Sequence, residues 1–113
     1  MSNSLLEYTP RASTRAKRFA IQIPVRYRKP RTSTWLEGTT KNISYSGVLF
    51  RAECLLEPKT SLELRFDLPA AILGEAPGKI FGKGVVVRVE RSPIAGIPPA
   101  LAVSVSGYRM TRA

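Results

Sequence analysis

Two stretches of this chain place an apolar residue at every second position, which is the pattern of a half-buried β-strand. In residues 19–27 the apolar positions are the odd-numbered ones, and in residues 62–68 they are the even-numbered ones. Pro24 interrupts the first stretch. Because proline donates no backbone hydrogen bond, we expect this strand to run along the edge of a sheet or to carry a bulge at Pro24.

The rest of the chain continues in short segments bounded by turns. Four more segments have β-like sequences, namely residues 35–43, 48–50, 79–91 and 101–105. The triplet Val85–Val87 is apolar at consecutive positions, so we expect its strand to be central, with both faces covered. Residues 69–78 are expected to form a loop, with a short helical turn as the alternative. Six strands and almost no helical periodicity predict an all-β barrel or sandwich.

The positive charge of the chain is concentrated near its N-terminus. The 113 residues carry a net charge of +10, and residues 1–31 hold eight Lys and Arg against one acid, Glu7. Residues 1–18 show no apolar periodicity, so we expect a flexible basic arm there, followed by one folded domain over residues 19–113. Such an arm suits an anionic partner, or it serves only to keep the chain soluble.

The composition argues against most kinds of catalytic site. The chain has no histidine, which removes the commonest general base and the commonest metal ligand. Seven of its eight acidic residues are scattered singly through residues 19–113, without the pairing that acid–base chemistry or a hard cation requires. Cys54, the single cysteine, is expected to be a small buried side chain in a reducing compartment. No segment has 18 consecutive apolar residues. We therefore expect a cytoplasmic, non-enzymatic protein without a cofactor and without membrane insertion.

Three motifs stand in an order that carries functional information. They are a basic cluster from Arg11 to Arg18, the segment Pro24-Val-Arg-Tyr-Arg28, and the pattern Asn42-x-Ser44-x-x-Gly47. Arginine can bind a phosphate, and it also matches the O6 and N7 acceptors of guanine with two parallel hydrogen bonds. Asn and Ser that alternate along an extended segment can bind a base edge, and Gly allows a positive φ or a close approach. Asn, Ser and Gly also occur in ordinary β-turns, which is the alternative interpretation.

Together these motifs resemble the PilZ domain, a bacterial receptor module for the second messenger cyclic di-GMP. The family pattern is RxxxR near the N-terminus, followed further along by [D/N]xSxxG. Downstream, Leu56-Glu-Pro-Lys-Thr60 resembles the family turn L-x-P-G-T, and Gly84-Val-Val-Val-Arg-Val89 resembles the family strand G-x-V-V-R-V. The resemblance extends from Arg11 to Tyr108 and implies a six-stranded antiparallel β-barrel that binds cyclic di-GMP.

The resemblance implies a ligand site between the basic arm and the third motif. It assigns cyclic di-GMP binding to Arg15, Arg18, Asn42, Ser44 and Gly47, with Arg11 and Lys17 as further candidates. Counting back from the Pro24 motif, the second arginine of the family pattern falls on Arg18 and the first falls on Thr14. A literal RxxxR lies at Arg11–Arg15 instead. Either the register of the arm is shifted, or Arg15 and Arg18 act together, or the ligand site is degenerate. Ligand binding is expected to order the arm across the barrel and to change the surface offered to a partner.

Two other functions stay open at this stage. A PilZ-like domain with an altered arginine motif can act as an adaptor through protein contacts alone, without nucleotide. A small basic barrel can bind single-stranded nucleic acid, but the nine aromatic residues form no stripe along the strands. Trp35 can stack on a base, although a lone tryptophan at a strand start is more typical of packing. We therefore predict a cyclic di-GMP receptor that signals to an unidentified downstream protein, with nucleic acid as the less favoured partner.

Overall fold

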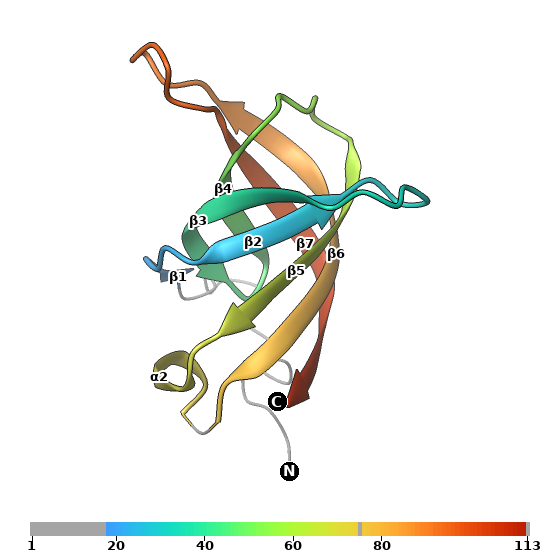
Figure 1. The fold of residues 1–113 in the computed structure, drawn as a ribbon, viewed down its shortest axis with the longest axis vertical. Coiled ribbons are helices and arrows are strands. Elements are labelled where there is room, and N and C mark those ends of the chain that lie inside the picture. Colours follow the sequence, from blue (N-terminus) through green and yellow to red (C-terminus); the bar gives the residue numbers. More distant parts are fainter. Residues whose placement is uncertain (1–17, 75, 113) are drawn as a thin grey trace, which may run out of the picture.

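The computed structural model describes residues 18–74 and 76–112, and nearly all of their regular structure is β-strand (Figure 1). The strands are β1 (Arg18–Phe19), β2 (Pro24–Arg28), β3 (Leu36–Ser44), β4 (Gly47–Ala52), β5 (Ser61–Leu68), β6 (Gly78–Glu90) and β7 (Ala100–Arg112). One short helix, α2 (Ala70–Leu73), lies between β5 and β6.

Six of these strands close into an antiparallel barrel. The order around the ring is β3-β2-β5-β6-β7-β4, and β4 pairs back with β3. The two-residue strand β1 pairs with the end of β3 that lies beyond the ladder between β2 and β3. The six-stranded antiparallel barrel predicted from the sequence is therefore confirmed.

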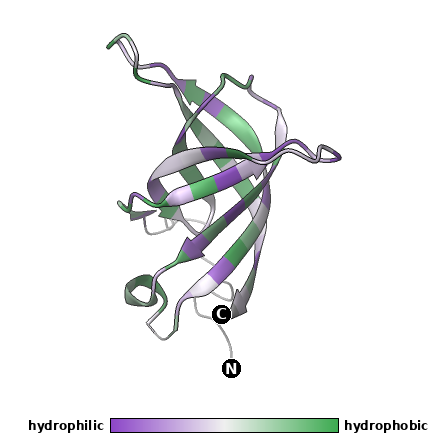
Figure 2. Cartoon of the chain, viewed as in Figure 1, coloured by the Kyte–Doolittle hydropathy of each residue, from purple (hydrophilic) through white to green (hydrophobic). Residues whose placement is uncertain are grey.

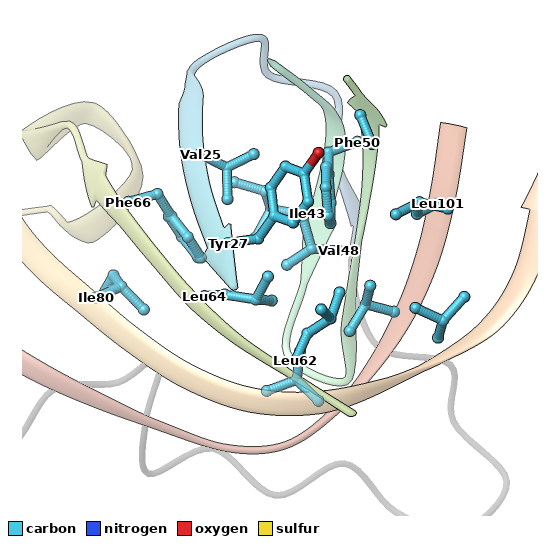
Figure 3. Packing of buried hydrophobic residues seen from close by; sticks show 14 of the residues in the cluster. Val25, Tyr27, Ile43, Val48, Phe50, Leu62, Leu64, Phe66, Ile80 and Leu101 are labelled. Carbon is cyan, nitrogen blue, oxygen red and sulfur yellow. The ribbon is translucent and has the colours of Figure 1, made fainter. Parts of the chain in front are cut away.

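The barrel interior is filled by the apolar side chains that alternate along the strands. The core includes Val25, Tyr27, Ile43, Val48, Phe50, Leu62, Leu64, Phe66, Ile80, Val86, Leu101 and Val103 (Figure 3). Figure 2 shows the same alternation as bands of opposite hydropathy along the strands. The Tyr27 ring packs 5.0 Å from the Phe50 ring, and its hydroxyl accepts a hydrogen bond from the backbone N–H of Glu53 at 3.0 Å. Burial raises the pKa of Tyr27 to about 12.

The single strand expected over residues 19–27 is divided into β1 and β2. Between β1 and β2, hydrogen bonds to the Thr40 side chain of β3 take the place of backbone pairing. The Thr40 hydroxyl donates to the Ile21 carbonyl at 2.5 Å and accepts from the Ile23 N–H at 2.9 Å. The Thr40 side chain is completely buried. Pro24 is the first residue of β2, and the ladder between β2 and β5 begins only after it. Both alternatives expected at Pro24 are thus wrong. Strand β2 lies between β3 and β5, its ladders show no register shift at Pro24, and it starts where the missing N–H is tolerated.

A register shift in β3 changes which of its side chains face the core. Strict alternation would place Leu36 and Ile43 on opposite faces. The pairing of β3 with β4 shifts between Thr40 and Asn42, and Ile43 is buried while Leu36 also packs against the core. The shift therefore turns Asn42 outward together with the residues on the outer face of the hairpin.

A second shift, in β6, explains why one expectation about Val85–Val87 is wrong. The strand is central as predicted, because β6 pairs with both β5 and β7. Its outer face is not covered, however: Val86 is buried, whereas Val85 and Val87 are 39% and 55% exposed. The register against β7 shifts between Val86 and Arg88, which leaves Val87 without a ladder position.

Three further local expectations differ from the structure. Residues 69–78 contain the helical turn α2, which ends at Gly74 with φ of 82°. The last strand extends past Val105 to Arg112, and Tyr108 within this extension packs against the core. Cys54 is exposed, because it lies beyond the end of β4 with its Sγ 4.0 Å from the Tyr27 hydroxyl.

Candidate functional site

The strand register brings together four of the predicted binding residues on the outer side of the barrel. Arg18 of β1 is the cross-strand partner of Ser44 in β3, and Ser44 is the partner of Gly47 in β4. Asn42 lies two residues before Ser44 and so faces the same way. Between them, Ile43 points into the core. The predicted residues Arg11, Arg15 and Lys17, and with them Thr14, lie outside the described residues.

Gly47 is required here for a close approach of strands. A Cβ atom at Gly47 would lie 2.5 Å from the carbonyl oxygen of Val103 in β7, a distance that real Cβ contacts do not reach. Positive φ angles occur at Gly74 and Gly96 and not at Gly47. Of the two roles that the sequence allowed for this glycine, the structure supports the close approach.

Ser44 is held by contacts within its own hairpin. Its hydroxyl donates to the Gly47 carbonyl at 3.3 Å and lies 3.4 Å from the Ser46 hydroxyl. The Ser46 carbonyl in turn accepts from the N–H of Val105 at 2.8 Å. Ser44 is only 8% exposed, and its side-chain contacts are long for hydroxyl hydrogen bonds.

Tyr108 of β7 fixes the same hairpin from inside the barrel. Its hydroxyl donates to the Ser44 carbonyl at 3.0 Å, and its ring meets Phe66 edge to face with centroids 6.1 Å apart. Burial raises the pKa of the Tyr108 hydroxyl above its ordinary value. The Tyr108 hydroxyl therefore stays protonated at physiological pH and continues to donate the hydrogen bond that positions Ser44.

The barrel wall beside these residues combines small side chains of β7 with the larger Leu49 of β4. Ser104 of β7 is the partner of Gly47, and Ala102 is the partner of Leu49. Leu49 is in turn the partner of Asn42. Small outward side chains keep the backbone close to the surface, which suits the approach of a flat ligand.

Arg88 borders this surface, and no role was assigned to it from the sequence. It is the cross-strand partner of Ala102, with an exposed side chain that binds the Glu90 carboxylate at 2.7 Å. The hydrogen bond from Arg88 lowers the pKa of Glu90, and the positive charges of Lys41 and Arg51 add to the effect. Strict alternation from the buried Val86 would have pointed Arg88 inward, so only the register shift places its charge on the outer face.

Two kinds of site are not observed in the described part of the chain. Within residues 18–74 and 76–112, no three His, Cys, Asp or Glu side chains gather where they could hold a metal ion. No helix among these residues has the length and hydropathy needed to cross a membrane.

The sequence itself identifies the family. A sequence model of the PilZ domain matches residues 11–106. The chain belongs to the PilZ domain family. PilZ domains are known as receptors of cyclic di-GMP and are typically binding or adaptor domains without catalytic activity. The comparison with curated proteins gives no match.

Solved structures of other PilZ proteins share this fold. The inhibitor of motility MotI/DgrA of Bacillus subtilis superposes with a TM-score of 0.68 at 18% sequence identity, over 90% of this chain and 45% of that protein. The PilZ domain of CeSA from a cellulose-synthesizing bacterium gives a TM-score of 0.53 at 20% identity, over 79% of this chain and 80% of that one. This chain thus spans less than half the length of MotI/DgrA, and at these identities the likeness is one of fold.

One departure from the PilZ pattern has a visible structural consequence. In the turn that resembles L-x-P-G-T, Lys59 stands where the family has glycine, and its φ is +77°. The left-handed conformation costs a residue with a side chain about 1–2 kcal/mol. The Lys59 N–H nevertheless donates to the Val86 carbonyl at 2.7 Å, which ties the turn to β6.

Proposed function

We propose that this PilZ domain is a receptor for cyclic di-GMP that binds the dinucleotide on the outer face of β1, β3 and β4. The observation that supports this proposal is the continuous row from Arg18 through Ser44 to Gly47, with Asn42 beside it. Motif residues that are about 25 positions apart in the chain thereby share one face, as a common binding role requires.

Each residue has a role that follows from its chemistry. Arg18 offers a planar fork that matches a phosphate or the O6 and N7 edge of guanine. Asn42 supplies an amide that can donate to and accept from a base edge, and Ser44 supplies a hydroxyl. Gly47 and the small residues of β7 leave room for a base to lie against the wall. Arg88, at the border of this wall, adds a fourth polar side chain that the sequence motifs did not suggest.

The basic segment before Arg18 completes the proposed site. The face formed by Asn42, Ser44 and Gly47 has no charge of its own, whereas the ligand carries two phosphates. Arg15, with Arg11 and Lys17 as further candidates, supplies the balancing charge, and ligand binding orders this segment across the barrel. The signal is that ordering, which changes the surface offered to a downstream protein. A second messenger acts in the cytoplasm, where we place this receptor.

The test is a calorimetric titration of the whole chain with cyclic di-GMP and, separately, with cyclic di-AMP. Saturable binding is expected for the guanine ligand only, because adenine presents a donor where guanine O6 accepts. Saturation at a hundred times the dissociation constant should raise the free energy of unfolding by about 2.7 kcal/mol. If millimolar cyclic di-GMP gives neither heat nor a change in melting temperature, the chain acts as an adaptor without nucleotide.

A further inference from the structure

The side of the barrel opposite the ligand face carries a row of arginines of its own. Arg26 of β2 pairs with Arg65 of β5, Arg65 pairs with Phe81 of β6, and Phe81 pairs with Arg109 of β7. We call these four outward residues the arginine row. In the ring of six strands, β5 and β6 lie opposite β3 and β4 (Figure 1). Arg65 and Phe81, the middle of the row, therefore lie away from the proposed cyclic di-GMP site, and Arg109 lies on β7 five residues beyond Ser104.

Aromatic rings hold two of these arginines in place. The Arg65 guanidinium lies 5.3 Å from the centre of the Trp35 ring, and the Arg109 guanidinium lies 5.2 Å from the centre of the Phe81 ring. The Arg28 guanidinium lies 4.2 Å from the centre of the same Trp35 ring. Stacking restrains a guanidinium through its face and leaves its N–H edge open to bind a carboxylate with two hydrogen bonds.

Neighbouring acids do not neutralise these two arginines. Among the described residues, Arg28 pairs with Glu63 at 2.8 Å and Arg26 lies 3.8 Å from Glu37. Arg65 and Arg109 make no ion pair with any described acid. Both are exposed, so they present their charges to an external partner.

A groove adjoins the arginine row at the end of the barrel near α2. It has a volume of about 710 Å³, with Ile23, Phe66 and Leu68 among its apolar lining and Arg26 and Arg65 among its charged lining. It forms because the ladder between β2 and β5 stops at the Phe66 pair. Among the residues that the structure describes, the last two of β5 pair with β6 alone. Lys79 and the acids Glu37 and Asp67 also line the groove, so its basic groups outnumber its acids. Arginine is enriched at protein interfaces, and their fully buried centres are more apolar than the rest of the surface.

We propose that the arginine row and this groove form a docking surface for an acidic segment of a partner protein. The segment places an apolar side chain in the groove and its carboxylates on Arg65 and Arg109. A nucleic acid fits less well, because the rings of Trp35 and Phe81 are already stacked by arginines of this chain. In addition, a continuous phosphate backbone would meet the three acids of this side, Glu37, Glu63 and Asp67, whereas separate carboxylates can avoid them.

The experiment measures binding of a short fluorescent peptide of alternating glutamate and leucine to the whole chain at physiological salt. The double variant Arg65→Glu/Arg109→Glu is compared with Lys59→Glu/Arg91→Glu, which changes the net charge equally at exposed positions outside the row. We expect the first to weaken binding at least about tenfold and the second to weaken it less than about threefold. The variant Arg65→Lys/Arg109→Lys keeps the charge but loses the planar fork. Its peptide affinity is expected to lie between those of the two charge-reversed variants. A peptide with serine in place of leucine should bind more weakly than the original to the wild-type chain.

Three outcomes would overturn the proposal. They are absence of peptide binding to the wild-type chain, equal loss in the two charge-reversed variants, and tighter row-dependent binding of a thymidine oligonucleotide of the same length. The last would assign the surface to nucleic acid. Unchanged melting temperatures show that the variants fold. Since both arginines lie away from the ligand face, cyclic di-GMP titration of the same variants separates failure of this proposal from failure of the proposed receptor function.

Discussion

The two sides of this barrel present polar groups in different ways. Around the hairpin end of β3 and β4, the residues Ser44 and Gly47, with Ser104 of the neighbouring β7, are small and neutral. On the side of β5 and β6, the outward residues are long, and the guanidinium groups of Arg65 and Arg109 rest on aromatic rings. The same antiparallel ring thus has one region where the backbone is near the surface and one region where arginines lie over aromatic rings.

This difference separates two binding tasks. A wall of small side chains accepts a flat ligand but supplies little charge, so the charge has to come from residues outside it, such as Arg18 and the basic segment before it. A wall of stacked arginines supplies its own charge at fixed positions, which suits a protein surface. The comparison leads to four predictions, of which three concern the ligand side and one concerns a turn outside both walls.

The largest expected effect is on folding and comes from Gly47→Ala. The added Cβ would lie 2.5 Å from the Val103 carbonyl oxygen, so β4 and β7 must move apart. We expect the free energy of unfolding to fall by about 1–3 kcal/mol, measured by urea denaturation. Gly107→Ala is the control, because its Cβ meets no atom within 4 Å. An equal effect of the two substitutions would show that the close approach does not matter.

The next effect concerns ligand binding. Arg18→Ala and Arg15→Ala are each expected to weaken cyclic di-GMP binding about tenfold or more, equivalent to about 1.4 kcal/mol, with a smaller loss for Arg11→Ala and a gain for Thr14→Arg. Arg109→Ala on the opposite side should leave the affinity unchanged. Calorimetry measures all five. Loss of binding in Arg11→Ala with no effect of Arg18→Ala would assign the site to the literal RxxxR motif.

A similar or smaller effect is expected for Tyr108→Phe, which keeps the ring but removes the hydrogen bond to the Ser44 carbonyl. The free energy of unfolding should fall by about 1 kcal/mol at neutral pH. Because burial raises the folded-state pKa of Tyr108 above the ordinary 10.0, the wild-type chain gains this contribution fully below pH 10 and loses it as the pH rises further. Tyr108→Phe should therefore reduce the alkaline fall in stability, measured by denaturation between neutral and strongly alkaline pH. Parallel pH profiles would contradict this role.

The smallest effect is a gain, at a turn that belongs to neither wall. Lys59→Gly relieves the positive φ of +77°, but glycine also gains conformational freedom in the unfolded chain. The net increase in the free energy of unfolding is expected to be about 0.5 kcal/mol, a rise of a few degrees in melting temperature. Lys59→Ala removes the same charge while keeping the strain, and should bring no increase.

The alternating apolar pattern of the sequence was sufficient to predict which side chains form the core and that the domain consists of strands. Val25, Tyr27, Leu62 and Leu64 lie inside the barrel as their period-two spacing predicts. The order of the basic cluster and the Asn42–Gly47 motif was sufficient to indicate the PilZ family, because those residues are local in the sequence. Local preferences also accounted for the turn at Leu56–Thr60, where the family glycine is replaced by Lys59 at a left-handed position.

Tertiary structure decided the features that depend on pairing between distant strands. The division of residues 19–27 depends on the buried Thr40 hydroxyl, and the outward positions of Asn42 and Arg88 depend on register shifts in β3 and β6. The arginine row joins four residues from four strands, and no local pattern indicates that Arg65 and Arg109 flank the same phenylalanine. A one-residue shift reverses the face of every side chain that follows it, and the energy that selects the shift comes from contacts across the barrel. The sequence by itself therefore determined which segments are strands and which residues carry the family motif, while only the closed barrel decided which side chains share a face.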